Sequence, residues 1–480
     1  MNNQAVEEWA EVFEVENFLS KERVDEAFDF LHEELEKLFE VEDFKVELGE
    51  VPKAFGRLKV EATLALSFKI ELLSDKMMFY FTPHPKIEMS RADLARIALH
   101  FESILRDFVE TGGKPTLYLF FASGQPLRAL RRLAKVEKFL SLIILGNMFY
   151  FFVFIFVLGF LMFSFLYYLT PVALVFIQLV IMFFANKLVL SRSDFTISRE
   201  NRFVYIANVR LRKSEIEKLA PFPMFKLAEV KDEVYSETLA KNLDVTNTSV
   251  ASALKRRGLS IDEGDVEVKK FDLYGIVEEV AKRFNVKVPS IGVLNVVQPN
   301  AMATGISPSR AALLITSGLL SRLSDVEVKA IIAHELSHVK SRDVLKLFIM
   351  FSSIFLFRAY ILWPKLALLT DFAFLVVSMT FLFFIAKFIE ARADLDAAYA
   401  IGDPKVLARS LKKITPTFVL KIQEARGIPV SEWLRWDTHP PISFRIRRLE
   451  KLETARKRGT FLKSIVDCLT GFISSLFKTL

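Results

Sequence analysis

The chain has 480 residues, of which 52% are hydrophobic and 25% are charged, and its formal net charge is +7. A disulfide-stapled secreted domain is excluded, because Cys468 is the single cysteine. A wholly soluble protein is disfavoured, because residues 139–186 carry no charged side chain. The first 50 residues are strongly acidic and the rest are basic. We ascribe the basic excess to the flanks of membrane helices, and we expect no nucleic-acid partner.

Residues 1–135 are predicted to form a soluble α+β domain of unknown role. Apolar residues alternate with mostly polar ones over 58–72, which predicts a strand with one buried face, and 116–121 predicts another. Apolar residues at helical spacing predict a helix over 94–108. His32 and His100 have no partner at metal-ligand spacing, so they are interpreted as ordinary core or surface histidines.

Two membrane hairpins are predicted. The first covers 139–190 and turns at Thr170-Pro171; the second covers 344–388 and is interrupted at Pro364. A buried helical pair in a soluble domain remains an alternative for the second hairpin. Basic residues flank both ends of the first hairpin, so we expect a multi-pass cell-membrane protein with both termini cytoplasmic.

The two predicted hairpins divide the rest of the chain into three further parts. Residues 191–270 are a charged cytoplasmic connecting segment with a strand at Phe203, and 271–460 hold the catalytic chemistry described next. Residues 461–480 form an amphipathic helix that lies on the membrane or packs against protein. The predicted fold class is therefore a mostly α membrane protein with α+β soluble parts and four transmembrane helices.

A metal-binding motif lies just before the second hairpin. His334, Glu335 and His338 form H-E-x-x-H in a segment that is free to be helical. Residues four apart share a helix face, so both imidazoles can bind one zinc ion. Glu335 then lies near the open coordination position, where it can take a proton from water and return it. We also expect this helix to continue into the third span.

Two histidines need a third protein ligand. Glu390 and Asp394 lie one turn apart in a helix-compatible segment that continues the fourth span. This spacing suits Glu390 as a ligand and Asp394 as the group that orients a ligand histidine. Taken alone, such an acidic pair is more often a solvated helix face.

With these motifs, the chain resembles the integral-membrane gluzincin metallopeptidases that include the heat-shock protease HtpX and the CAAX prenyl protease. Further matches are Pro299 to Gly305 (Pro-Asn-Ala-Met-Ala-Thr-Gly), the run from Gly318 into the His334 helix, and Thr438-His-Pro-Pro441 followed by Arg445. The resemblance covers roughly 140–190 and 270–455. Four spans are similar to the HtpX layout, and residues 1–135 have no counterpart in it.

The resemblance implies a gluzincin-type protease domain with one Zn²⁺ per chain. It also implies that Asn300 and Ala301 hold the substrate backbone, and that His439 and Arg445 stabilise the oxyanion.

We therefore expect a zinc endopeptidase that cleaves cytoplasmic segments of membrane proteins in quality control, with its active site cytoplasmic. Its expected partners are the lipid bilayer and protein or peptide substrates. A partner or regulator of residues 1–135, and the oligomeric state, stay open. Two alternatives also stay open: a site-specific processing peptidase for lipidated or membrane-tethered peptides, and a non-catalytic scaffold that retains a zinc site.

Overall fold

A computed structural model describes most of the chain. The described residues are 11–36 without Phe18, 40–60, 63–85, 116–123, 164–191, 193–211, 224–296, 298–362, 368–415, 428–452 and 460–479, with Met89, Glu215 and scattered residues of 94–108. Within them the strands form three separate sheets.

The first sheet belongs to the N-terminal part and is antiparallel, in the order β1-β5-β4-β3-β2. Its strands are β1 (Glu11–Glu16), β2 (Glu40–Glu47), β3 (Lys53–Val60), β4 (Thr63–Leu72) and β5 (Lys76–Pro83). Helix α1 (Val24–Glu36) and the apolar face of 94–108 pack into its core. The strand predicted over 58–72 is wrong in one respect, because it is a hairpin in which Leu58 pairs with Leu66. The period-two alternation continues through both arms, so it cannot reveal the turn.

The second sheet joins segments from both sides of the first predicted hairpin. Its order is β6-β8-β9, from β6 (Thr116–Ala122), β8 (Phe203–Arg210) and β9 (Val266–Asp272). Helices α7 (Met224–Glu237) and α8 (Asn247–Arg256) cover one face. The strands expected at 116–121 and Phe203 are confirmed, but β6 pairs with β8 rather than with the N-terminal sheet.

The third sheet supports the candidate site, in the order β11-β12-β10-β7. Its strands are β7 (Phe195–Ile197), β10 (Ser290–Leu294), β11 (Ala301–Thr304) and β12 (Ala312–Thr316). The helices that share its core include α9 (Leu273–Phe284), α10 (Ser317–Arg322), α11 (Asp325–Ser341), α14 (Pro404–Ile414) and α17 (Ile442–Glu450). Strand β12 is buried along its whole length, whereas β11 forms an edge of the described sheet and is partly exposed.

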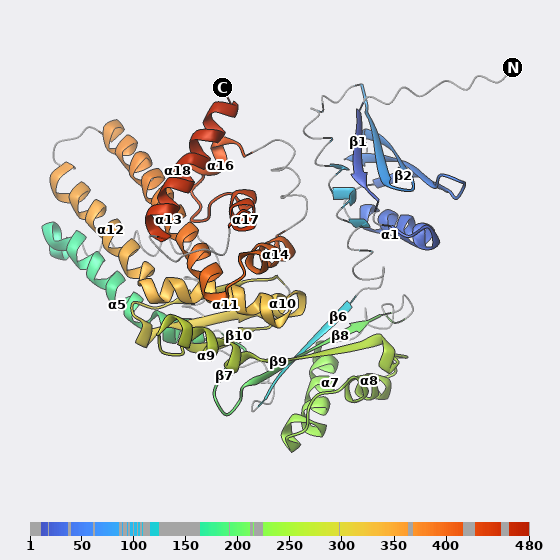
Figure 1. Cartoon of the computed structure of the whole chain (residues 1–480), viewed down its shortest axis with the longest axis horizontal. Coiled ribbons are helices and arrows are strands. Elements are labelled where there is room, and N and C mark those ends of the chain that lie inside the picture. The colour runs from blue at the N-terminus through green and yellow to red at the C-terminus, as the bar shows by residue number, and fades with distance from the viewer. Residues whose placement is uncertain are drawn as a thin grey trace.

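Long apolar helices extend from one side of this core. They are α5 (Thr170–Leu190), α12 (Asp343–Phe357) with its π-helical extension η7 (Arg358–Leu362), α13 (Leu368–Ile401) and α18 (Thr460–Thr479). Each is long and apolar enough to cross a membrane. Figure 1 shows α5, α12 and α13 side by side, and their contacts agree. The span predicted before Thr170 falls mostly outside the described residues.

The helix that carries the histidine motif ends before the membrane helix begins. Arg342 adopts a left-handed conformation with φ 54°, so α11 ends at Ser341 and α12 starts at Asp343. The prediction that α11 runs on into the third span is therefore wrong. The corresponding prediction for the fourth span, that it continues into the helix of Glu390, is confirmed, because both lie in one helix of 34 residues.

The amphipathic C-terminal helix α18 packs its small residues against α13, α16 (Val430–Leu434) and α17. Ser464, Cys468 and Ser475 are buried, whereas the large apolar side chains of Leu462, Val466, Leu469, Ile473 and Phe477 are exposed. Cys468 lies against Lys387 of α13 and Phe472 against Phe384, so the two helices run antiparallel. Cys468 is therefore a buried free thiol in this interface.

Candidate metal centre

Helix α11 brings two imidazoles together. Its first turn is closed by a capping box between Ser324 and Glu327, which satisfies free amide groups at the helix start. Residues His334 and His338 are one turn apart, and their Nε2 atoms lie 3.3 Å from each other. His334 is buried, whereas His338 is partly exposed.

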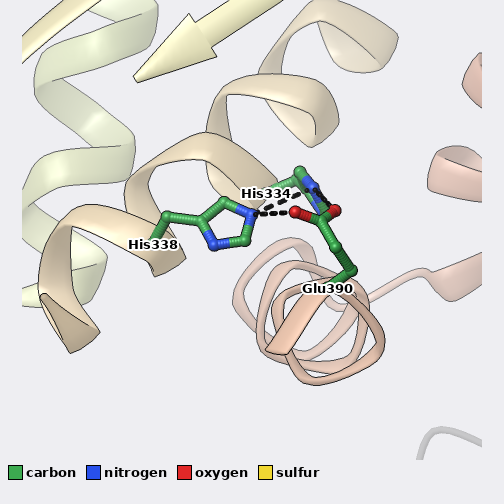
Figure 2. A group of neighbouring side chains, drawn as sticks. All are labelled: His334, His338 and Glu390. Carbon is green, nitrogen blue, oxygen red and sulfur yellow. Dashed lines mark hydrogen bonds and ion pairs between the residues drawn. The ribbon is translucent and has the colours of Figure 1, made fainter. Parts of the chain in front are cut away.

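Glu390 of α13 completes a cluster of three donors (Figure 2). Its Oε2 lies 3.3 Å from Nε2 of His334, and its Oε1 lies 3.4 Å from Nε2 of His338. Donor atoms bound tetrahedrally to zinc at 2.0–2.2 Å are about 3.3–3.6 Å apart. Buried Oε2 also has no hydrogen-bond donor among the described residues. The three side chains therefore fit a metal ion with two imidazole ligands and one carboxylate ligand.

Asp394 lies behind His334, away from the donor cluster. Its Oδ1 is 3.0 Å from Nδ1 of His334, and its carboxylate accepts hydrogen bonds from Nε and Nη2 of Arg445 at 2.8 and 2.7 Å. Burial lowers the pKa of His334, but the hydrogen bond to Asp394 and the charge of Glu390 outweigh burial and raise the pKa to about 10. Burial likewise lowers the pKa of Arg445, but Asp394 raises it above its ordinary value.

Glu335 and strand β11 lie on the open side of the cluster. Oε2 of Glu335 accepts a hydrogen bond from the backbone N–H of Ala303 at 2.8 Å, and Glu335 is partly exposed. Asn300 instead faces β12, because its carbonyl accepts a hydrogen bond from the N–H of Thr316. The backbone groups of Ala301, the next residue, therefore point to the free edge of the strand.

His439 lies on the other side of Glu390. Its Nε2 is 3.6 Å from Oε2 of Glu390, and its side chain is 53% exposed. Asp437 accepts a hydrogen bond from the N–H of His439. Thus the structure brings His334, His338, Glu390 and His439 together. Arg445 reaches the same region, but two of its nitrogens bind Asp394.

Comparison with known proteins agrees with this geometry. The family model for peptidase family M48 matches residues 268–453. A protease HtpX homolog of Caldanaerobacter subterraneus is 30% identical over 38% of this chain and 73% of its own length. Homologs of the same description from Thermococcus sibiricus (30% identity; 38% and 73%) and Aquifex aeolicus (32%; 39% and 72%) match similarly.

The chain belongs to peptidase family M48. It is therefore a membrane-associated metalloendopeptidase, and the expected fold class of membrane helices with soluble α+β parts is confirmed. The family match begins within β9. It therefore leaves out the whole N-terminal sheet and two strands of the second sheet, β6 and β8.

The sequence reasoning missed a second pair of supporting side chains in this family M48 domain. Oδ2 of Asp343 lies 2.9 Å from Nδ1 of His338, and Nη2 of Arg392 donates to the same oxygen at 2.5 Å. Asp343 and Arg392 are both buried. The sequence signal for this contact was a carboxylate five residues after His338. In a helix that continued through Arg342, however, Asp343 would lie on a different face from His338, so the contact was not predicted.

Proposed function

We propose that this chain is a zinc-dependent membrane endopeptidase that cleaves cytoplasmic segments of membrane proteins, in quality control. The observation that carries the proposal is the spacing of the three donor atoms with Glu335 beside them. His334, His338 and Glu390 would hold the ion. When bound, zinc would supply Lewis-acid polarisation of the scissile carbonyl and of the attacking water.

Proton transfer and substrate binding are carried out by side chains and backbone groups of the protein. Glu335 accepts a proton from the attacking water and returns it to the leaving nitrogen. Its hydrogen bond to Ala303 holds the carboxylate at the edge of β11. A substrate segment adds as an extended strand along that edge, where Ala301 offers backbone groups and exposed Asn300 offers its amide.

Charge that develops on the carbonyl oxygen is stabilised by His439, which is exposed toward the site. Arg445 contributes mainly by holding Asp394, and Asp394 holds Nδ1 of His334. Such a carboxylate fixes the tautomer and orientation of a ligand histidine.

The membrane would lie around the apolar parts of α5, α12 and α13. At the end of these helices far from His338, Arg358 pairs with Asp371, and the Tyr360 hydroxyl donates to the carbonyl of Tyr168. These contacts support a common outer end for the three helices, with the metal centre at the cytoplasmic end.

The exposed apolar face of α18 would lie against lipid beside α13. The contact of Phe472 with Phe384 supports this placement, because it sets α18 beside the apolar part of α13.

A glutamine in place of Glu335 tests the proposal. Glu335→Gln should lower kcat by more than about 100-fold and leave zinc stoichiometric, because only the proton acceptor is lost. Cleavage of a reconstituted membrane-protein substrate and elemental analysis measure the two quantities. His334→Ala, in contrast, should lose stoichiometric zinc. Wild-type cleavage by Glu335→Gln with zinc bound would refute the hydrolytic mechanism and favour a scaffold.

A further inference from the structure

A single charged residue, Lys387, interrupts the apolar run of α13 between Asp371 and Glu390. It is completely buried, with 0% of its surface exposed. A buried ammonium group is costly unless hydrogen-bond acceptors replace the water that it loses. The catalytic cluster does not use this group, so its partners need an explanation.

The partners of Lys387 are backbone carbonyls of one loop. Its Nζ donates to the carbonyl of Arg435 at 2.9 Å and to the carbonyl of Asp437. Between them, Trp436 stacks on Phe383 of α13, with the ring centroids 6.3 Å apart. Three consecutive loop residues are therefore attached to the membrane helix α13.

This loop leads directly to His439. The carboxylate of Asp437 accepts from the N–H of His439 at 3.1 Å and lies 3.3 Å from its Nδ1. The His439 side chain is half exposed, so burial does little to hold it. Its Nε2 nevertheless lies 3.6 Å from Glu390, which is one helical turn after Lys387.

Lys387 and Glu390 therefore act from adjacent turns of one rigid helix. Glu390 is a proposed ligand, and Lys387 sets where the backbone before His439 lies relative to that ligand. A distance shift of about 1 Å in a catalytic group can cost a large factor in rate.

We propose that Lys387 is a positioning residue that clamps the 435–437 backbone onto α13, so that His439 faces the oxyanion beside Glu390. This inference rests on the proposed function, because it needs His439 to act in peptide hydrolysis. It also makes the cytoplasmic end of the fourth span part of the active-site framework.

The experiment is a double-mutant cycle between Lys387→Met and His439→Ala in the full-length protein. Methionine keeps the length of the side chain but removes its donors. We expect Lys387→Met to lower kcat about 10- to 100-fold, with KM nearly unchanged and zinc retained. The double variant should lose little more than His439→Ala alone, because both changes remove the same interaction. Lys346→Met, an exposed lysine of α12, should match the wild type.

Hydrogen exchange separates this role from general destabilisation. Amides of 435–439 should exchange at least about 10-fold faster in Lys387→Met, whereas those around Ala397 in the buried part of α13 should be unchanged. If Lys387→Met does not fold, Lys387→Gln, which keeps a neutral donor, takes its place.

Two results would overturn the proposal: multiplicative losses in the double variant, or wild-type kcat in Lys387→Met. Neither would disturb the proposed function, which Glu335→Gln tests separately. Full activity of His439→Ala alongside an inactive Glu335→Gln would also refute the clamp while leaving the peptidase intact.

Discussion

At the scale of single residues, the candidate centre is built from two matched chains of contacts. His334 binds Asp394, which binds Arg445, and His338 binds Asp343, which binds Arg392. In each chain a buried carboxylate lies between an imidazole and a guanidinium group. A carboxylate on the far nitrogen orients the ring and makes the near nitrogen a better donor to metal. Both histidines of the candidate centre are therefore oriented by a buried carboxylate.

Asp343→Asn should weaken zinc binding by about 10- to 100-fold, because the amide cannot accept the imidazole proton as strongly. Competition with a chelator of known affinity measures the change. Asp396→Asn is the matched control, because Asp396 contacts Ser337 and Arg392 but neither ligand histidine. Equal zinc affinity in wild type and Asp343→Asn would show that the contact with His338 is incidental.

At the scale of elements, the start of α11 is stabilised by a buried ionic group. Glu327 accepts hydrogen bonds from the N–H and hydroxyl of Ser324, and it pairs with Lys413 of α14. Burial raises the pKa of Glu327, but the contacts with Ser324 and Lys413 prevail and place it below its ordinary value of 4.5. The helix that presents His334 and His338 is thus attached to its neighbour by one carboxylate.

Glu327→Gln should lower the free energy of unfolding at pH 7 by about 1 kcal/mol, because the amide keeps the cap but loses the ion pair with Lys413 and the charge that strengthens the hydrogen bonds from Ser324. Because the folded pKa of Glu327 is depressed, its contribution is complete above pH 4.5 and disappears as the pH falls through the folded pKa. In thermal unfolding in detergent, the Tm of the wild type should therefore exceed that of Glu327→Gln, and this difference should shrink below pH 4.5. Asp325→Asn, an exposed change in the same first turn, should show no comparable pH dependence.

At the scale of the whole molecule, the apolar helices bind the catalytic elements to the membrane. Helix α12 begins at Asp343, which contacts His338, and α13 carries Glu390. Two of the apolar helices therefore carry groups of the candidate metal centre at the ends that face the catalytic core. We therefore expect that loss of the membrane environment disturbs the arrangement of the candidate metal centre as well as the packing of the apolar helices.

Single cysteines test this placement, in a Cys468→Ala background that removes the one native thiol. Ile361→Cys, exposed at the proposed outer end, should react with a membrane-impermeant maleimide from outside only. Ile473→Cys on the exposed face of α18 should react with an apolar maleimide but not with the charged one.

Ser260→Cys, exposed in the predicted cytoplasmic segment, is the control and should be labelled from the cytoplasmic side only. Labelling of Ile361→Cys from the cytoplasmic side would reverse the proposed orientation. Rapid labelling of Ile473→Cys by the charged reagent would place α18 in water.

Features that depend on short spacing or on composition could be predicted from the amino-acid sequence. Residues four apart share a helix face, so His334 and His338 were predictable as a pair, and a long uncharged run predicts membrane helices wherever it folds. Features that join distant segments depend on the tertiary structure: β6 with β8, Asp343 of α12 with Arg392 of α13, and Lys387 with the loop before His439. Periodicity records which face of an element is buried but not which element covers it, so these partners appear only when the chain is folded.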